Sequence, residues 1–158
     1  MKKLIIYSVL TIICCSIAAI ALAGNEASTQ VTLVVDPINE IAVTGGNISM
    51  TINTATAGSN PDNAADLFTC DLLWTSNESN RKITVSTSLA NPKFTLYVTS
   101  LNTVGGTFLG PVELSTTPID YITGISQTTG SCDLMYLAYA TAAQGTGTDI
   151  HTAVTYTL

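Results

Sequence analysis

The chain has 158 residues and a net charge of −6 at pH 7, and only 10% of its residues are charged. This length is sufficient for one domain with a real hydrophobic core. The acidic balance argues against binding to nucleic acid or to anionic lipid, because both of these partners are themselves negatively charged.

The first segment has the features of a cleavable secretion signal. Lys2 and Lys3 give it a positive start, residues 4–20 are almost entirely apolar, and Ala21–Ala23 provides a small-x-small cleavage site. We therefore expect residues 1–23 to be removed on export, with an uncleaved anchor as the alternative. Without this segment, three bases remain against eleven acids, a net charge of −8. No second apolar stretch is long enough to span a membrane.

Residues 24–36 form an N-terminal extension that contains the pattern of a β-strand. Val31, Leu33 and Val35 alternate along it and would share one face of an extended chain. Two interpretations are open. The segment can be the first strand of the domain that follows, or a free strand that completes the fold of a neighbouring molecule.

Residues 37–158 have the pattern of a single all-β domain. Short alternations of apolar and polar residues recur between turn signals, and no window has a convincing helical period. We expect an Ig-like antiparallel β-sandwich of about nine strands. The expected strands cover residues 38–43, 48–52, 68–74, 83–89, 94–98, 112–114, 119–125, 132–138 and 150–158.

Two cysteines follow the leader, Cys70 and Cys132, and both fall at inward positions of expected strands. Because exported proteins fold in an oxidising compartment, we expect a disulfide bond between them. Closing this loop of about sixty residues is worth about 4 kcal/mol in the chain-entropy model. The alternative is a pair of buried thiols. The spacing is not the C-x-x-C spacing of a redox or zinc site.

The sequence lacks a recognisable set of catalytic residues. Its one histidine, His151, is expected on the solvated side of the last strand, with no second histidine to support it. Asp62, Asp66 and Asp71 come closest to an acidic cluster but do not have the spacing of a calcium loop. We therefore expect no enzymatic activity, no cofactor and no metal. A hydrolase whose carboxylates converge only in space stays open.

Three segments together resemble one known family. They are the alternating strand that ends at Asp36-Pro37, the polar turn with paired bases at residues 77–84, and the final strand at residues 153–158. The chain in these places is similar to the major subunits of chaperone–usher fimbriae of the alternate class, the colonisation-factor pilins of enteric bacteria. Two features depart from that family: the pair of cysteines, and Tyr156 in third place from the end, where many pilins have an aromatic residue next to last.

The resemblance implies an Ig-like sandwich that lacks one strand and exposes an apolar groove. A periplasmic chaperone would fill the groove first. The next subunit's N-terminal strand would then replace it as an outer-membrane usher exports the fibre to the cell surface, where the fibre serves adhesion. The alternative function is a secreted monomeric β-sandwich that binds carbohydrate or a protein ligand. The implied donor residues are Val31, Leu33 and Val35, and the implied groove residues are Ile150, Val154 and Tyr156.

Overall fold

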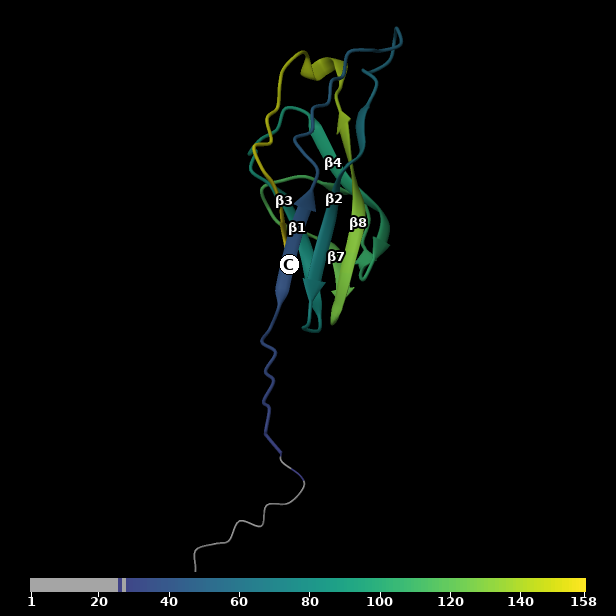
Figure 1. The fold of residues 1–158 in the computed structure, drawn as a ribbon. Coiled ribbons are helices and arrows are strands. Elements are labelled where there is room, and N and C mark those ends of the chain that lie inside the picture. The colour runs from purple at the N-terminus through teal and green to yellow at the C-terminus, as the bar shows by residue number, and fades with distance from the viewer. Residues whose placement is uncertain (1–25, 27) are drawn as a thin grey trace, which may run out of the picture. The chain divides into compact units, whose positions relative to one another are not determined.

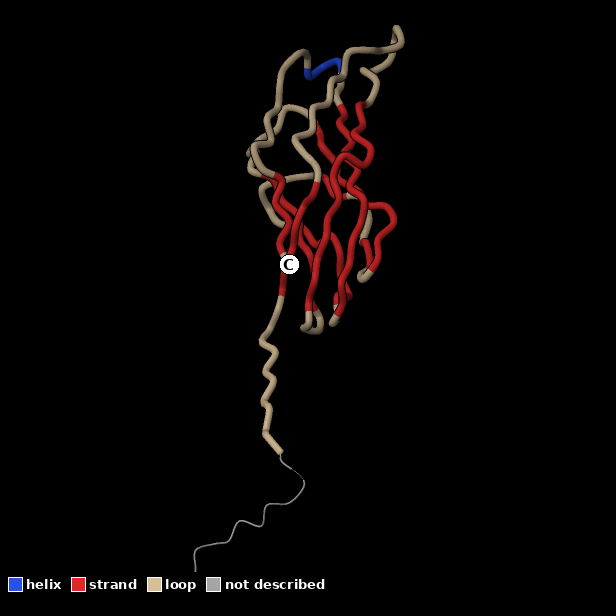
Figure 2. The backbone as a smooth tube through the Cα atoms, in the orientation of Figure 1, coloured by secondary structure: helices blue, strands red, loops and turns tan. Residues whose placement is uncertain are grey.

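The computed structural model describes Glu26 and residues 28–158 (Figures 1 and 2). The expected signal, residues 1–23, lies outside the described residues. Residues 36–158 form one compact unit, and the described residues before it belong to a separate unit. The described part of the chain contains no helix with the length and hydrophobicity needed to cross a bilayer.

The compact unit is built from two antiparallel sheets that pack as a β-sandwich, which confirms the predicted all-β class (Figure 2). Its strands are β1 (Asn39–Thr44), β2 (Ala64–Ser76), β3 (Arg81–Thr87), β4 (Thr95–Val104), β5 (Thr107–Phe108), β6 (Val112–Glu113), β7 (Ile119–Ile125), β8 (Thr128–Tyr139) and β9 (Val154–Thr157). The five-stranded sheet has the order β1-β2-β8-β4-β6, and the four-stranded sheet has the order β5-β7-β3-β9. One short 3₁₀ turn, Ala142–Gln144, precedes β9.

The pairing of β2 with β8 forms the centre of the five-stranded sheet. In β2, Leu72 and Trp74 are buried and Leu73 between them is exposed. Successive side chains of this strand therefore point alternately to the core and to solvent. The register shifts between Leu67 and Cys70, where Phe68 has a φ of 66°. This bulge turns Phe68 out to half-exposure, although its spacing predicts a core position.

The core between the sheets contains a cluster of aromatic side chains. Tyr121 packs against Phe108 and Tyr156, with ring centroids 5.3 and 5.8 Å apart. The hydroxyls of Tyr136 in β8 and Tyr156 in β9 are 2.9 Å apart and hydrogen-bonded, which links the two sheets. Burial raises the pKa of Tyr156 and of Tyr136, so both hydroxyls stay neutral.

Several expected strands differ from the observed ones: β2 and β4 are longer, β5 was not expected, and the expected strands at residues 48–52 and 150–158 changed most. Residues 46–54 belong to no strand, although Ile48 and Met50 still pack against the core. Their alternation correctly indicated the inward face, but no neighbouring strand lies in register to pair with them. The last strand begins at Val154 rather than at Ile150, because residues 145–153 are an irregular connection.

Gly130 tests the packing around the buried Trp74 indole, because it lies opposite Trp74 in the β2–β8 ladder. A Cβ atom at Gly130 would lie 2.1 Å from Cε2 of the Trp74 indole. We expect Gly130→Ala to lower the free energy of unfolding by about 1–3 kcal/mol, as overpacking of a core does. Urea denaturation measures the change. Gly46→Ala is the control, because a Cβ there meets nothing within 4 Å, and equal losses from both variants would contradict the expectation.

Candidate functional site

A groove runs between β1 and β9, which are each an edge strand of one of the two sheets. The opposite edges of the sheets are β6 and β5. The groove has a volume of about 250 Å³. In Figure 1 the arrow of β1 lies beside the C-terminal strand, and the two strands run in opposite directions. Each of these strands pairs with a neighbour on one side only. The groove is lined by Ile41, Ala42, Val43, Val154, Thr155 and Tyr156.

The groove-facing edge of β1 has no hydrogen-bond partner in its own sheet. Ile38, just before β1, uses both backbone groups on the opposite side. Its N–H donates to Asn77 Oδ1 at 2.7 Å, and its carbonyl accepts from Asn77 N at 3.1 Å. Since successive residues of a strand direct their backbone groups to opposite edges, Asn39, Ile41 and Val43 direct theirs into the groove.

The edge of β9 mirrors this arrangement. The Ala153 carbonyl accepts a hydrogen bond of 2.9 Å from the N–H of Ser88, so Ala153 faces β3. The same alternation then turns the backbone groups of Val154 and Tyr156 toward the groove. Their side chains lie on the core side, because each is opposite a buried residue of β3, Thr87 or Val85.

Apolar side chains and unpaired backbone groups therefore face the same space. Ile41 and Val43 lie on the core side of β1, opposite Trp74 and Leu72 in the ladder with β2. Val43 is nevertheless 48% exposed, because no strand covers it from the groove side. This combination is what an added β-strand requires: main-chain partners for affinity and pockets for alternate side chains.

One end of the groove is crossed by polar contacts that connect its two borders. The Asn39 side chain, at the start of β1, accepts from the Ser76 hydroxyl at 2.8 Å and donates to the Glu78 carboxylate. Glu78 lies 3.9 Å from Nη1 of Arg81, whose Nη2 donates to the Leu158 carbonyl at 3.2 Å. The turn from β2 to β3 therefore links the start of β1 to the end of β9.

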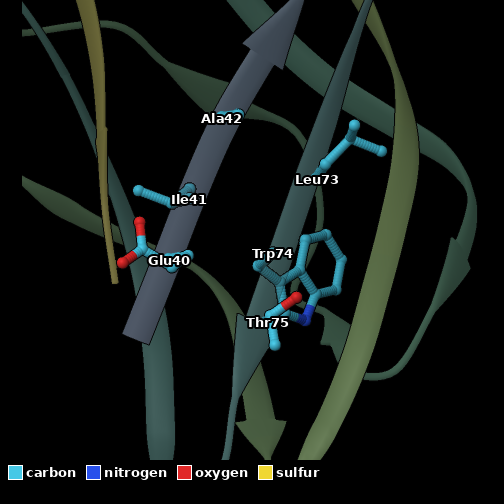
Figure 3. Close-up of a pocket in the computed structure, with 6 residues that line it drawn as sticks. All are labelled: Glu40, Ile41, Ala42, Leu73, Trp74 and Thr75. Carbon is cyan, nitrogen blue, oxygen red and sulfur yellow. The ribbon is translucent and has the colours of Figure 1, made fainter. Parts of the chain in front are cut away.

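A second depression lies along the ladder between β1 and β2, with a volume of about 190 Å³ (Figure 3). It consists of residues paired directly across that ladder, such as Ile41 with Trp74 and Ala42 with Leu73. Figure 3 also shows the yellow C-terminal strand on the side of β1 away from β2. The depression is therefore part of the sheet surface and brings no further chemical groups together.

Of the three groove residues that the resemblance implies, two line the groove and one does not. Val154 and Tyr156 line the groove between β1 and β9. Ile150 is not among the lining residues and is 68% exposed in the connection before β9. Sequence reasoning missed Ile41 and Val43. Their alternation was visible, but a pattern does not show which edge of a strand lacks a partner.

The proposed donor residues belong to no strand. Residues 28–38 have no strand assignment, so β1 is the first strand that the described chain adds to the sandwich. Val31, Leu33 and Val35 are 84%, 86% and 68% exposed. Three apolar side chains at strand spacing are thus open to solvent in a segment that lies outside both sheets.

The expected disulfide is wrong: Cys70 and Cys132 are both free, buried thiols. In the β2–β8 ladder Cys70 is opposite Leu134 and Cys132 is opposite Leu72, so the cysteines are diagonal neighbours. Such positions are about 7–8 Å apart, whereas bonded cysteines need Cα atoms within about 6.8 Å. Cys70 Sγ instead donates to the Gly46 carbonyl at 3.4 Å. Burial raises the pKa of Cys132 to about 11.

The single histidine is less solvated than its position in the sequence suggested. His151 is half-buried, with Nδ1 2.8 Å from the Thr87 hydroxyl, and burial lowers its pKa. Within the described residues, no three His, Cys, Asp or Glu side chains are placed to hold a metal ion.

Comparisons of the chain with models of protein families, with characterised proteins and with solved structures found no match.

Thiol titration checks the correction at Cys70 and Cys132. For the protein that begins after Ala23, we expect Ellman's reagent to find two thiols per chain in guanidinium chloride without any reductant. In the native protein at mildly alkaline pH, the reaction should be much slower, because both thiols are buried and their raised pKa values keep them protonated. A denatured, unreduced chain with no reactive thiol would show that the disulfide forms after all.

Proposed function

We propose that the protein is a structural subunit of a surface fibre in which the extension of one subunit fills the groove of the next. The groove between β1 and β9 carries this proposal, because two unpaired backbone edges and a row of apolar side chains border it. Strand addition satisfies both kinds of group at once. An open strand edge is a liability for a monomer, and strand exchange turns it into an assembly site.

The extension has the dimensions and the pattern that the groove requires. Residues 29–35 span about 23 Å as a β-strand, similar to the roughly 20 Å of the six residues of β1. Val31, Leu33 and Val35 would point to the core from a strand in the groove, beside Ile41 and Val43. Burying their exposed surface supplies the main driving force for insertion.

The position of the extension favours an open polymer. The extension joins the domain at the Asn39 end of β1. A donor strand parallel to β1 has its own domain at the Thr44 end of the acceptor, so successive subunits stack in one direction. The reverse orientation brings the two extension-bearing ends together and closes a dimer. We therefore expect the donor strand to run parallel to β1 and antiparallel to β9.

The partners of such a subunit follow from the same groove. Before a neighbouring subunit arrives, the apolar groove needs cover, and a periplasmic chaperone that supplies its own strand would provide it. An outer-membrane usher would then exchange that strand for the extension of the next subunit. The competing function, a secreted monomer that binds a ligand, has no need of a free extension with three exposed apolar residues.

Leu33→Asp tests the donor strand. We expect about tenfold less polymer or lower, because an unpaired charge in an apolar groove costs more than about 1.4 kcal/mol. The readout is a gel of purified protein in cold detergent and after boiling, in which strand-exchanged fibres give a ladder only when cold. Thr32→Asp is the matched control, because residue 32 points away from the core in the same strand. Equal ladders from Leu33→Asp and from the unaltered chain would exclude residues 29–35 as donor.

Val43→Asp tests the acceptor groove with an unaltered extension. Val43 lies on the core side of β1 and is half-exposed, so the fold should tolerate the charge while the groove rejects a donor strand. We expect a similar loss of polymer, and Leu73→Asp, on the outer face of β2 and outside the groove lining, as a control that polymerises normally. A single monomer band from the unaltered protein, cold and boiled, would instead favour the monomeric binding module.

A further inference from the structure

The side chain of Asn77 holds the chain at the base of the extension. Its Oδ1 accepts from the N–H of Ile38 at 2.7 Å, and its Nδ2 donates to the carbonyl of Asp36 at 2.8 Å. The backbone N–H of Asn77 adds a bond of 3.1 Å to the Ile38 carbonyl. We call this set of three hydrogen bonds the Asn77 clamp. It continues the β1–β2 ladder beyond its last pair, Asn39 with Ser76.

The clamp fixes the direction in which the chain enters β1. Asp36 and Ile38 both bond to the β2 side, so residues 36–38 continue the line of β1 past its Asn39 end. For the extension to fill the groove of its own domain, the chain must reverse before Asn39 and return along the other edge of β1. Such a reversal takes Asp36 and Ile38 out of the clamp and breaks its hydrogen bonds.

Pro37 opposes the same reversal. The tight two-residue turns that connect antiparallel strands need a positive φ at the first central residue or at both, and Pro37 cannot take these positions because its ring fixes φ near −65°. A wider loop avoids this restriction only by removing residues 36–38 from Asn77. Pro37 and the Asn77 side chain therefore both oppose a reversal of the chain at residues 36–38.

We propose that the Asn77 clamp prevents each subunit from filling its own groove and so reserves the extension for a second copy of this chain. The inference rests on the proposed strand exchange, because it assumes that residues 29–35 fit the groove. A self-filled subunit, whose extension lies in its own groove, would be a dead end for assembly: it can neither donate nor accept a strand. Asn77 is thus a positioning residue for polymer growth.

Asn77→Ala tests the proposal in the protein that begins after Ala23. The chain is refolded by dilution to a low concentration, and the monomer fraction is isolated by size exclusion. A fluorescent peptide with the sequence of residues 28–36 then reports open grooves, and hydrogen exchange of residues 29–35 reports self-filling. We expect the ratio of self-filled to open monomer to rise about tenfold or more, since two lost hydrogen bonds of typical strength amount to one to two decades.

Controls separate this effect from a general loss of stability. Asn63→Ala removes an exposed asparagine from the loop before β2 and should leave peptide binding unchanged. Asn77→Asp keeps the acceptor for the Ile38 N–H and removes only the donor to Asp36. It should raise the ratio of self-filled to open monomer as well, and it replaces Asn77→Ala in the experiment if that variant does not fold. A variant that is merely less stable would still bind the peptide and would show no protection of residues 29–35.

The outcomes also distinguish this inference from the proposed function. If the unaltered protein forms no polymer and binds no peptide, strand exchange fails and the clamp has nothing to direct. If the unaltered protein polymerises and binds the peptide, but both Asn77 variants behave as Asn63→Ala does, strand exchange stands and the role of the clamp is refuted. Protection of residues 29–35 in the monomers of both Asn77 variants, with loss of peptide binding, supports it.

Discussion

The structure depends on one constraint: each strand has two backbone edges, and β1 and β9, which are edge strands like β5 and β6, each pair along only one of them while bordering the same groove. The other seven strands, the aromatic core and the hydrogen bond between Tyr136 and Tyr156 hold these two edges at a fixed separation. The space between them is therefore a preformed groove rather than a flexible gap. Because an unpaired backbone edge in an apolar setting is costly, the groove is the place where this fold has most to gain from a partner.

The turn between β2 and β3 organises the region around the groove. The turn and the strand residues that flank it bond to the start of β1 through Ser76, Asn77 and Glu78, and to the residue after β9 through Arg81. One short polar segment thus connects both borders of the groove and the base of the extension. A fibre subunit of the proposed kind needs this connection. The same end of the domain must direct its own extension away from the groove and must keep the groove open for the extension of another subunit.

Much of the fold and part of the site could be predicted from local patterns. Alternation identified the all-β class, the inward positions of Cys70 and Cys132, and the last strand, whose Val154 and Tyr156 lie beside the core. It failed where a neighbouring strand decides the outcome. The cysteines both point inward, but a two-residue offset in the β2–β8 register keeps them apart. Ile48 and Met50 also point inward, yet their segment has no strand to pair with.

The sequence by itself determined the class of fold, the face that each strand turns to the core, and an alternating apolar segment ahead of the domain. These depend on side-chain period and turn residues, which are local. Only the tertiary structure decided that β1 and β9 border a common groove, that Ile41 and Val43 contribute to it, and that Asn77 holds Asp36 and Ile38. Those features depend on which distant strands pair and in which register, and hydrogen bonds between segments about forty residues apart leave no periodic trace in the chain.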